Sequence, residues 1–544
     1  MGALLLAVDL GTTSLKACLY EVGHSLTLRA ATSRALTLRL EADGTAEQDP
    51  RQWWQALASA VPELLALTGT GPDQVRGLTF CSQMQCLVLV DAAGDPVRPA
   101  LSYLDQRPTA RMATLTRGGP RIAGIGAGLL VPWLRVSGGV AASVKDPLWK
   151  YLRVADEEPA AFARVHRWLD AKDYLTARAT GRFTMSIDSA FATFLADTRH
   201  DGCTWSPWLV QRFGVRPEHL PQIVPMAEIV GELTTTAAEE LGLAPGTHVL
   251  AGGGDASLIG VGAGAVGVGE THVYVGTSGW VSTVADRRIV DARTMMATVP
   301  GPQRGRYSYF GEQETSGKCF EWAADHLFQD AAPEPDMRAA HPHQDAAAAP
   351  TSPEDAPPEV IDRLMAAVTT VPAGCGGVLF APWLHGSRSP FEDPNVRGMF
   401  FNVGLTTGHG QLVRSVIEGI AYNKRLLLEA QARKVTPSAV IRFAGGGAVS
   451  DTTGQILADV LDRPVEAVTD PQLVGAAGAA LVAAWGLGLV SSLDEAAATV
   501  RVRRRFEPDP ATRDVHDANF AVFRDLYPAT KSLYARLNAG ADRG

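Results

Sequence analysis

A glycine–hydroxyl turn between two apolar strands occurs twice in this chain. The first copy spans residues 4–20, with the turn at residues 11–13, and the second spans residues 272–284, with the turn Gly-Thr-Ser-Gly at residues 276–279. Each copy has the pattern of a β-hairpin with a polar turn. The repetition predicts two copies of one structural plan.

The chain is long enough for the two cores that such a duplication needs. It has 544 residues, of which 46% are hydrophobic, and a single core stops growing at roughly 250 to 300 residues. Residues with helical spacing alternate with apolar runs, as in residues 54–65 and 76–80, which is the pattern of an α/β protein. We predict an N-terminal lobe over residues 1–247 and a C-terminal lobe over residues 248–544. The segment 330–358, rich in Ala, Pro, Asp, Glu and His, predicts a flexible insertion in the second lobe.

Composition argues against nucleic-acid and membrane partners. Lys and Arg total 49 against 58 Asp and Glu, a net charge of -9, and no long basic block occurs. No segment reaches the roughly 20 apolar residues that span a bilayer, and the first residues lack the features of a signal peptide. The six cysteines include no CxxC pair, which fits a reducing cytoplasm. We expect a cytoplasmic protein that binds a small molecule, and a homodimer is left open.

The two turns carry groups that phosphoryl transfer requires: donors for phosphate oxygens, a carboxylate for a divalent cation, and a nearby base. Backbone amides in such turns bind anions, Lys16 adds positive charge, and Asp9 can face Mg²⁺ directly or through water. A single Asp-Gly-Thr turn is as often only a tight hairpin, so the repetition is what favours two turns closing on one polyphosphate. The phosphate-binding candidates are Gly11, Thr12, Thr13, Lys16, Gly276, Thr277 and Ser278.

A carboxylate and a third glycine-rich turn complete the candidate site. Asp255 follows three consecutive glycines, which allow close backbone approaches, and its residue type fits a general base and a helix N-cap equally well. Gly445, Gly446 and Gly447 lie between a predicted strand at residues 439–443 and a helix. That position is common for a nucleotide contact.

Two further glycine motifs resemble other nucleotide-binding motifs, but each match is incomplete. Residues 262–267 match GxGxxG, but no strand leads directly into them and the glycine pattern continues to Gly269. Gly317 and Lys318 resemble the end of a P-loop, but Cys319 takes the place of its Ser or Thr and the earlier glycine is one residue too far back. We set both interpretations aside.

The whole set of motifs resembles the FGGY carbohydrate kinases, and most closely their xylulokinase branch. The correspondence runs from about residue 4 to the C-terminal helix. Besides the turns above, the motifs at residues 48–54, 172–175, 385–390 and 414–419 occur in the order that such kinases show.

The resemblance implies an α/β fold of two actin-like lobes (ribonuclease H-like, ASKHA) with a cleft between them. It implies ATP-dependent phosphorylation of a small sugar or polyol, first of all a ketose such as xylulose. In that scheme Asp255 is the catalytic base, Asp9 lies near Mg²⁺, and both Gly-Thr turns contact phosphates. The three glycines at residues 445–447 contact the adenosine side.

The acceptor-binding motifs depart from the xylulokinase branch. Gln85 replaces a sugar-contacting histidine, and Ala256 replaces the asparagine that follows the catalytic aspartate. Asp105 is retained as the expected hydroxyl acceptor, with Arg107 as a candidate partner. These changes leave a polyol or tetrulose kinase open, and a non-catalytic sugar- or nucleotide-sensing protein on the same fold is the alternative from another class. The acceptor-binding candidates are Gln83, Met84, Gln85, Asp105 and Asp255.

Overall fold

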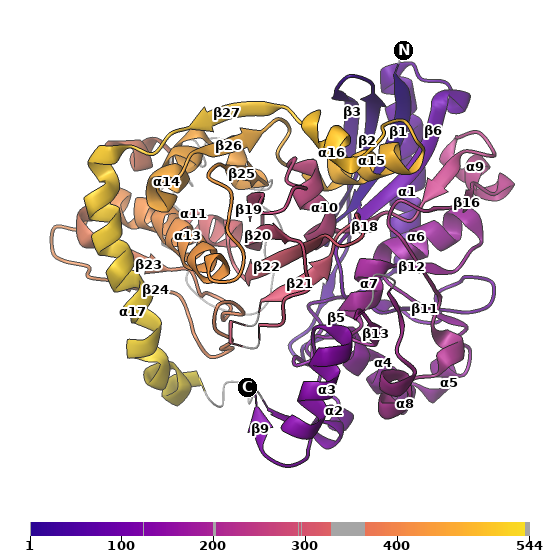
Figure 1. Ribbon diagram of the computed structural model, residues 1–544, viewed down its shortest axis with the longest axis horizontal. Helices are drawn as coiled ribbons and strands as arrows, with labels where there is room; N and C mark the ends of the chain where they lie inside the picture. Colours follow the sequence, from indigo (N-terminus) through magenta and orange to yellow (C-terminus); the bar gives the residue numbers. More distant parts are fainter. Residues whose placement is uncertain are drawn as a thin grey trace, which may run out of the picture.

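Two mixed β-sheets organise the molecule (Figure 1). The computed structural model describes residues 2–122, 124–199, 203–291, 293–294, 296–327 and 365–538. The insertion predicted at residues 330–358 lies outside these ranges. We call the parts built on the first and second sheets the N-terminal lobe and the C-terminal lobe.

The first sheet has the strand order β16-β17-β6-β1-β2-β3, and β18 also pairs with β6. Its strands are β1 (Ala3–Leu10), β2 (Ser14–Val22), β3 (Leu26–Ala35), β6 (Val75–Ser82), β16 (Ile229–Glu232), β17 (His248–Leu250) and β18 (Gly253–Gly254). The hairpin β1–β2 is antiparallel, and Asp9 lies opposite Lys16 in its register. The strand β6 runs parallel to β1 on the other side.

The second sheet has the strand order β21-β22-β20-β19-β25-β26-β27. Its strands are β19 (Thr271–Val275), β20 (Gly279–Ala285), β21 (Ala297–Pro300), β22 (Tyr307–Gln313), β25 (Ile441–Ala444), β26 (Val465–Val468) and β27 (Val502–Phe506). The hairpin β19–β20 is antiparallel, and β25 runs parallel to β19.

Apart from β18 and β21, the two sheets repeat one arrangement. Each contains an antiparallel three-strand unit, β1-β2-β3 or β19-β20-β22, whose first strand pairs in parallel with β6 or β25. A second parallel strand follows, β17 or β26, and then an antiparallel edge strand, β16 or β27. The duplication predicted from the two hairpins is therefore confirmed.

Amphipathic helices cover both sheets. The helix α1 (Pro50–Thr68) begins after Asp49, whose side chain accepts a hydrogen bond from the Arg51 amide, and it packs on β2 and β3. Proline at the first helical position and a capping aspartate are typical of such a start. The long helix α13 (His409–Ala432) packs on β20, β22 and β23 (Leu379–Ala381), and α17 (Arg513–Asn538) runs along the outside of this lobe (Figure 1). None of the helices in the described part of the chain is both long and apolar enough to cross a bilayer.

Two helices connect the lobes. The helix α10 (Asp255–Gly262) packs against α15 (Val474–Gly486), which lies on β1 and β6 of the first sheet although it belongs to the C-terminal half of the chain (Figure 1). A Cβ atom at Gly262 would lie 1.9 Å from the Val474 carbonyl oxygen. The first glycine of the GxGxxG match is thus required by helix packing.

The division of the chain into lobes differs from the predicted boundary between residues 247 and 248. Both β17 and β18 pair with β6, so the first sheet continues past that boundary. The reason is that these short strands pair with a strand far away in the sequence, and local patterns do not reveal such a partner.

Candidate active site

A cavity of about 1450 Å³ lies between the two sheets and is lined by residues of both. Its lining brings together most of the residues predicted from the sequence. These are Asp9, Gly11, Thr12, Thr13, Lys16, Gln83, Met84, Gln85, Asp255, Gly276, Thr277, Ser278, Gly446 and Gly447. Residues separated by more than 400 positions in the sequence therefore face one space.

The first turn is held by a closed set of hydrogen bonds. The Gly11 amide donates to the Ser14 carbonyl at 2.9 Å. The Thr12 hydroxyl donates to Gln83 Oε1 at 3.1 Å, Gln83 Nε2 donates to Gln48 Oε1 at 2.8 Å, and Gln48 Nε2 donates back to the Thr12 carbonyl at 2.8 Å. Gln83 thus links the phosphate-binding candidates of the first turn to the loop that carries Met84 and Gln85.

Asp9 lies at the end of β1, at the cavity wall. Burial raises the pKa of its carboxyl group, while the charge of Lys16 and a hydrogen bond from Cys81 oppose that shift. Among the described residues, no group of three His, Cys, Asp or Glu side chains could hold a metal ion by itself. Mg²⁺ bound to a nucleotide needs only one or two carboxylates, because phosphates and waters complete its octahedral shell. The carboxylate of Asp9 fits such a site.

The second turn repeats the first and leaves no room for a side chain at its first residue. The Gly276 amide donates to the Ser278 carbonyl at 2.9 Å, and the Gly276 carbonyl accepts from the Gly317 amide at 2.6 Å. A Cβ atom at Gly276 would lie 2.6 Å from the hydroxyl oxygen of Tyr274. That ring is stacked on Trp280, with the ring centroids 4.3 Å apart, so it has little freedom to move away.

The start of α11 (Gly317–Leu327) also belongs to the site. Gly317 and Lys318, set aside above as a weak P-loop match, line the cavity beside the second turn. They form no P-loop, because Gly317 supports the turn by donating its amide hydrogen to Gly276.

The third glycine turn contributes two of its three residues to the cavity lining. Gly446 and Gly447 line the cavity together with Ser450. Gly445 lies behind them and donates its amide hydrogen to the Pro471 carbonyl at 2.8 Å. The structure therefore gives Gly445 a supporting place in the turn.

Asp255 is the first residue of α10 and faces the cavity. Its Oδ1 atom accepts a hydrogen bond from the Ala256 amide at 2.8 Å. The preceding Gly254 pairs with β6 and donates its amide hydrogen to Asp188 Oδ2 at 2.7 Å. Asp255 can therefore begin α10 and face the cavity at the same time. Its bond to the Ala256 amide at the helix start fixes the direction of the carboxylate.

The electrostatic surroundings of Asp255 disfavour its charged form. Burial raises the pKa of its carboxyl group to about 8, the Ala256 amide opposes the shift, and the charges of Asp9 and Glu312 add to it. A carboxyl group with a pKa near the working pH is an efficient acceptor of a proton.

The loop that carries Gln85 is clamped in an uncommon backbone conformation. Gln85 has a φ of 63°, which costs a non-glycine residue about 1 to 2 kcal/mol. Asp170 accepts hydrogen bonds from the amides of Gln85 and Cys86 at 3.2 and 3.0 Å. Lys150 donates to the carbonyls of Gln85 and Ser102 at 3.0 and 2.6 Å. These buried ionisable groups were not predicted, because each is a single residue far from the loop in sequence.

The chain matches two family models. Residues 4–262 match the N-terminal domain, and residues 272–487 match the C-terminal domain, of the FGGY family of carbohydrate kinases. The chain belongs to this family. The resemblance drawn from the sequence motifs is confirmed, and so is the fold of two actin-like lobes.

Curated relatives align with nearly the whole of this FGGY kinase. A xylulose kinase of Bacillus subtilis is 27% identical over 537 residues, covering 98% of each chain. A gluconokinase of the same organism is 23% identical over 543 residues, covering 99% of this chain and 98% of the relative. The crystal structure of a ligand-bound xylulose kinase from Lactobacillus acidophilus superposes with a TM-score of 0.82 at 22% identity, covering 98% of this chain and 99% of that one. The chain is a carbohydrate kinase.

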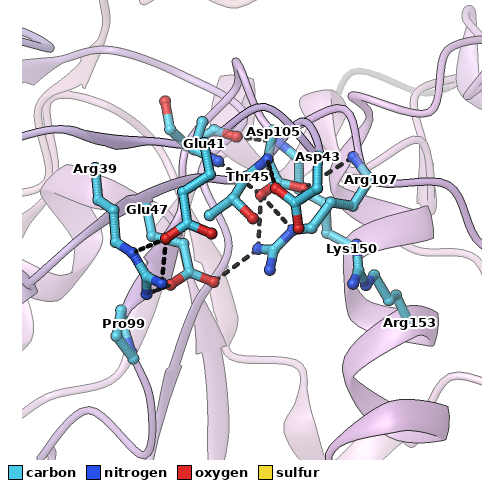
Figure 2. Close-up of polar contacts among 12 residues, drawn as sticks. Arg39, Glu41, Asp43, Thr45, Glu47, Pro99, Asp105, Arg107, Lys150 and Arg153 are labelled. Carbon is cyan, nitrogen blue, oxygen red and sulfur yellow. Dashed lines mark hydrogen bonds and ion pairs between the residues drawn. The ribbon is translucent and has the colours of Figure 1, made fainter. Parts of the chain in front are cut away.

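One predicted substrate contact of the kinase is absent from the cavity wall that the structure describes. Asp105 is 1% exposed, and the lining includes Tyr103 and Leu104 but not Asp105. Figure 2 shows Arg107 between Asp105 and Glu47, with Arg107 Nη2 at 2.7 Å from a carboxylate oxygen of each. The predicted pairing with Arg107 is confirmed. The carboxylate of Asp105 is occupied within the lobe, and its contact with a substrate hydroxyl stays a prediction.

The buried pair gives a stability prediction. Asp105→Ala leaves Arg107 with part of its charge unpaired, so we expect the free energy of unfolding to fall by about 3 kcal/mol, as measured by urea denaturation. The KM for the acceptor should change by less than about threefold, because Asp105 lies outside the lining. The exposed Asp73→Asn, in the same lobe, is the control and should leave the stability and the KM nearly unchanged. Unchanged stability with a large rise in acceptor KM would restore Asp105 as a substrate contact.

Proposed function

We propose that this kinase transfers the γ-phosphoryl group of ATP to a hydroxyl of a small sugar or polyol, with a ketose such as xylulose as the first candidate. The observation that carries the proposal is the position of Asp255 in a cavity that both glycine–hydroxyl turns line. A base, two sets of phosphate donors and the loop that carries Met84 and Gln85 line one cavity, as the reaction requires.

In this mechanism Asp255 accepts the proton of the attacking hydroxyl. The amides of residues 12–13 and 277–278 hold the terminal phosphates from opposite lobes, the glycine amides at 11 and 276 being used within their turns, and Lys16 adds positive charge. Gly446 and Gly447 allow the adenosine side to approach the backbone. Mg²⁺, when bound near Asp9, neutralises charge on the phosphate oxygens. Closure of the two lobes on both substrates excludes water from the transfer.

A polyol or tetrulose is the second candidate acceptor. Its support comes from two positions in or beside the acceptor pocket, Gln85 and Ala256, which differ from the residues of the xylulokinase branch. Because a pocket built to bond one hydroxyl rejects analogues that lack it by roughly 10⁴ to 10⁵, such changes are sufficient to move the preference between acceptors.

Release of ADP over a panel of acceptors tests the proposed activity. The panel contains xylulose, ribulose, erythrulose, xylitol, erythritol and glycerol, each with MgATP and a coupled readout. We expect one acceptor class to give turnover well above the hydrolysis of ATP alone. Absence of turnover with every acceptor, despite measurable ATP binding, would favour a sensing protein on the same fold.

The raised pKa of Asp255 predicts the pH dependence of the reaction. The carboxylate is active only when deprotonated, so kcat/KM should rise about tenfold per pH unit below the pKa and level off above about pH 8. Initial rates from pH 6 to pH 9.5, at constant ionic strength and with excess coupling enzymes, measure this. A flat profile across that range would contradict the assignment of Asp255 as the base.

A further inference from the structure

Arg388 lies between carboxylates of the two lobes at one side of the cavity. Its Nη2 atom is 3.7 Å from Asp146 Oδ1, and its Nε atom is 3.7 Å from Glu312 Oε2. Asp146 directly precedes α4 (Pro147–Glu157) in the N-terminal lobe, and Glu312 belongs to β22 in the C-terminal lobe. All three side chains line the cavity.

The distances leave hydrogen-bonding capacity for a ligand. At 3.7 Å, neither contact of Arg388 is short enough for a hydrogen bond. Asp146 is 1% exposed, and its Oδ2 atom accepts from the Ser143 amide at 2.9 Å. Its buried Oδ1 atom has no hydrogen-bond partner. An unpaired buried acceptor is costly unless a ligand or water satisfies it.

Carboxyl groups surround Arg388; burial raises the pKa of Asp146 to about 6 and raises that of Glu312, and the charge of Arg388 opposes both shifts. Glu314 and Glu392 interact with its guanidinium group in addition to Asp146 and Glu312. Lys145 is 3.9 Å from Glu314 and offsets that charge.

Glu312 also lies close enough to the proposed base for its charge to raise the pKa of Asp255. Lys424 faces Glu312 from α13, but burial holds the pKa of Lys424 well below its usual value. The acidic side of the cavity therefore adjoins the place where the acceptor hydroxyl must lie.

We propose that Asp146, Glu312 and Arg388 bind the hydroxyl-bearing chain of the acceptor, and that their net negative charge selects a neutral ketose or polyol and rejects a sugar acid. This inference rests on the proposed kinase function. A neutral hydroxyl donates to a carboxylate and accepts from the guanidinium group, and both bonds are charge-assisted. The carboxylate of an aldonate would instead meet Glu312 and Asp146, and like charges in a partly buried site are strongly disfavoured.

The comparison of neutral and acidic acceptors tests the inference. We expect kcat/KM for gluconate and xylonate to lie about 10²-fold or more below that of the best neutral acceptor, in the ADP-release assay with the full chain. Equal or better use of an aldonate would overturn the inference while the kinase function stands. Absence of turnover with every acceptor, neutral or acidic, would overturn the function and the inference with it.

The variant Glu312→Gln tests the residue itself. It removes one negative charge with little change of shape, so we expect the ratio of kcat/KM between neutral acceptor and aldonate to fall about tenfold. The pH at which kcat/KM levels off should also fall, because the charge of Glu312 raises the pKa of Asp255. Glu63→Gln, on the surface of the N-terminal lobe, is the control. Unchanged ATP affinity would show that the variant is folded, and an unchanged acceptor ratio in that folded variant would overturn the assignment.

Discussion

Asp255→Asn is expected to lower kcat by about 10² to 10⁴ and to leave the Kd for ATP within about twofold. The amide side chain keeps the shape of the carboxylate and its bond to the Ala256 amide, but it does not accept a proton. Steady-state kinetics with the best acceptor of the panel measure kcat, and calorimetric titration with MgATP measures the Kd.

Asp43→Asn is the matched control, because it makes the same chemical change at an exposed position. Near-normal turnover of Asp255→Asn would remove Asp255 from the role of base. A parallel loss of ATP affinity would instead mean that this residue supports the nucleotide site.

Gly276→Ala is expected to raise the Kd for MgATP by about 10- to 100-fold. The added methyl group would lie 2.6 Å from the hydroxyl oxygen of Tyr274, and Trp280 restricts the movement of that ring. The turn must therefore shift, and its amides lose their alignment with the phosphates. A displacement of about 1 Å is enough to cost roughly 10²-fold in a positioned site.

Gly23→Ala provides the control for a glycine in a hairpin turn. A Cβ atom at Gly23 would meet no other atom within 4 Å, so its ATP affinity and melting temperature should be unchanged. Normal ATP affinity of a folded Gly276→Ala variant would mean that the second turn is only structural.

The parts of the fold that local patterns determine were predictable. Alternating apolar residues and a glycine–hydroxyl turn specify a hairpin without reference to the rest of the chain, and β1–β2 and β19–β20 form as expected. The repeated turn also indicated the duplication of the sheets. The boundary between the lobes was not predictable in this way, since β17 and β18 pair with β6, far away in the sequence.

Some residues of the candidate site were likewise predictable from local motifs, and others were not. Asp9, Asp255 and the glycine turns stand in short motifs whose chemistry is visible in the sequence. Asp146, Glu312 and Arg388 come from three separate segments, and only the packing of the two lobes brings them together. Asp105 shows the opposite case, in which a residue with suitable chemistry is occupied by Arg107. The sequence alone predicted that Arg107 pairs with Asp105, but it did not predict where Asp105 lies relative to the cavity.

A crystal structure with a non-hydrolysable ATP analogue, Mg²⁺ and the preferred acceptor tests the arrangement of the two turns most directly. We expect the β- and γ-phosphates to lie between residues 11–13 and 276–278, with an acceptor hydroxyl within hydrogen-bonding distance of Asp255 and directed at the γ-phosphorus. A triphosphate bound by one turn only, or an acceptor held away from Asp255, would contradict the proposed mechanism.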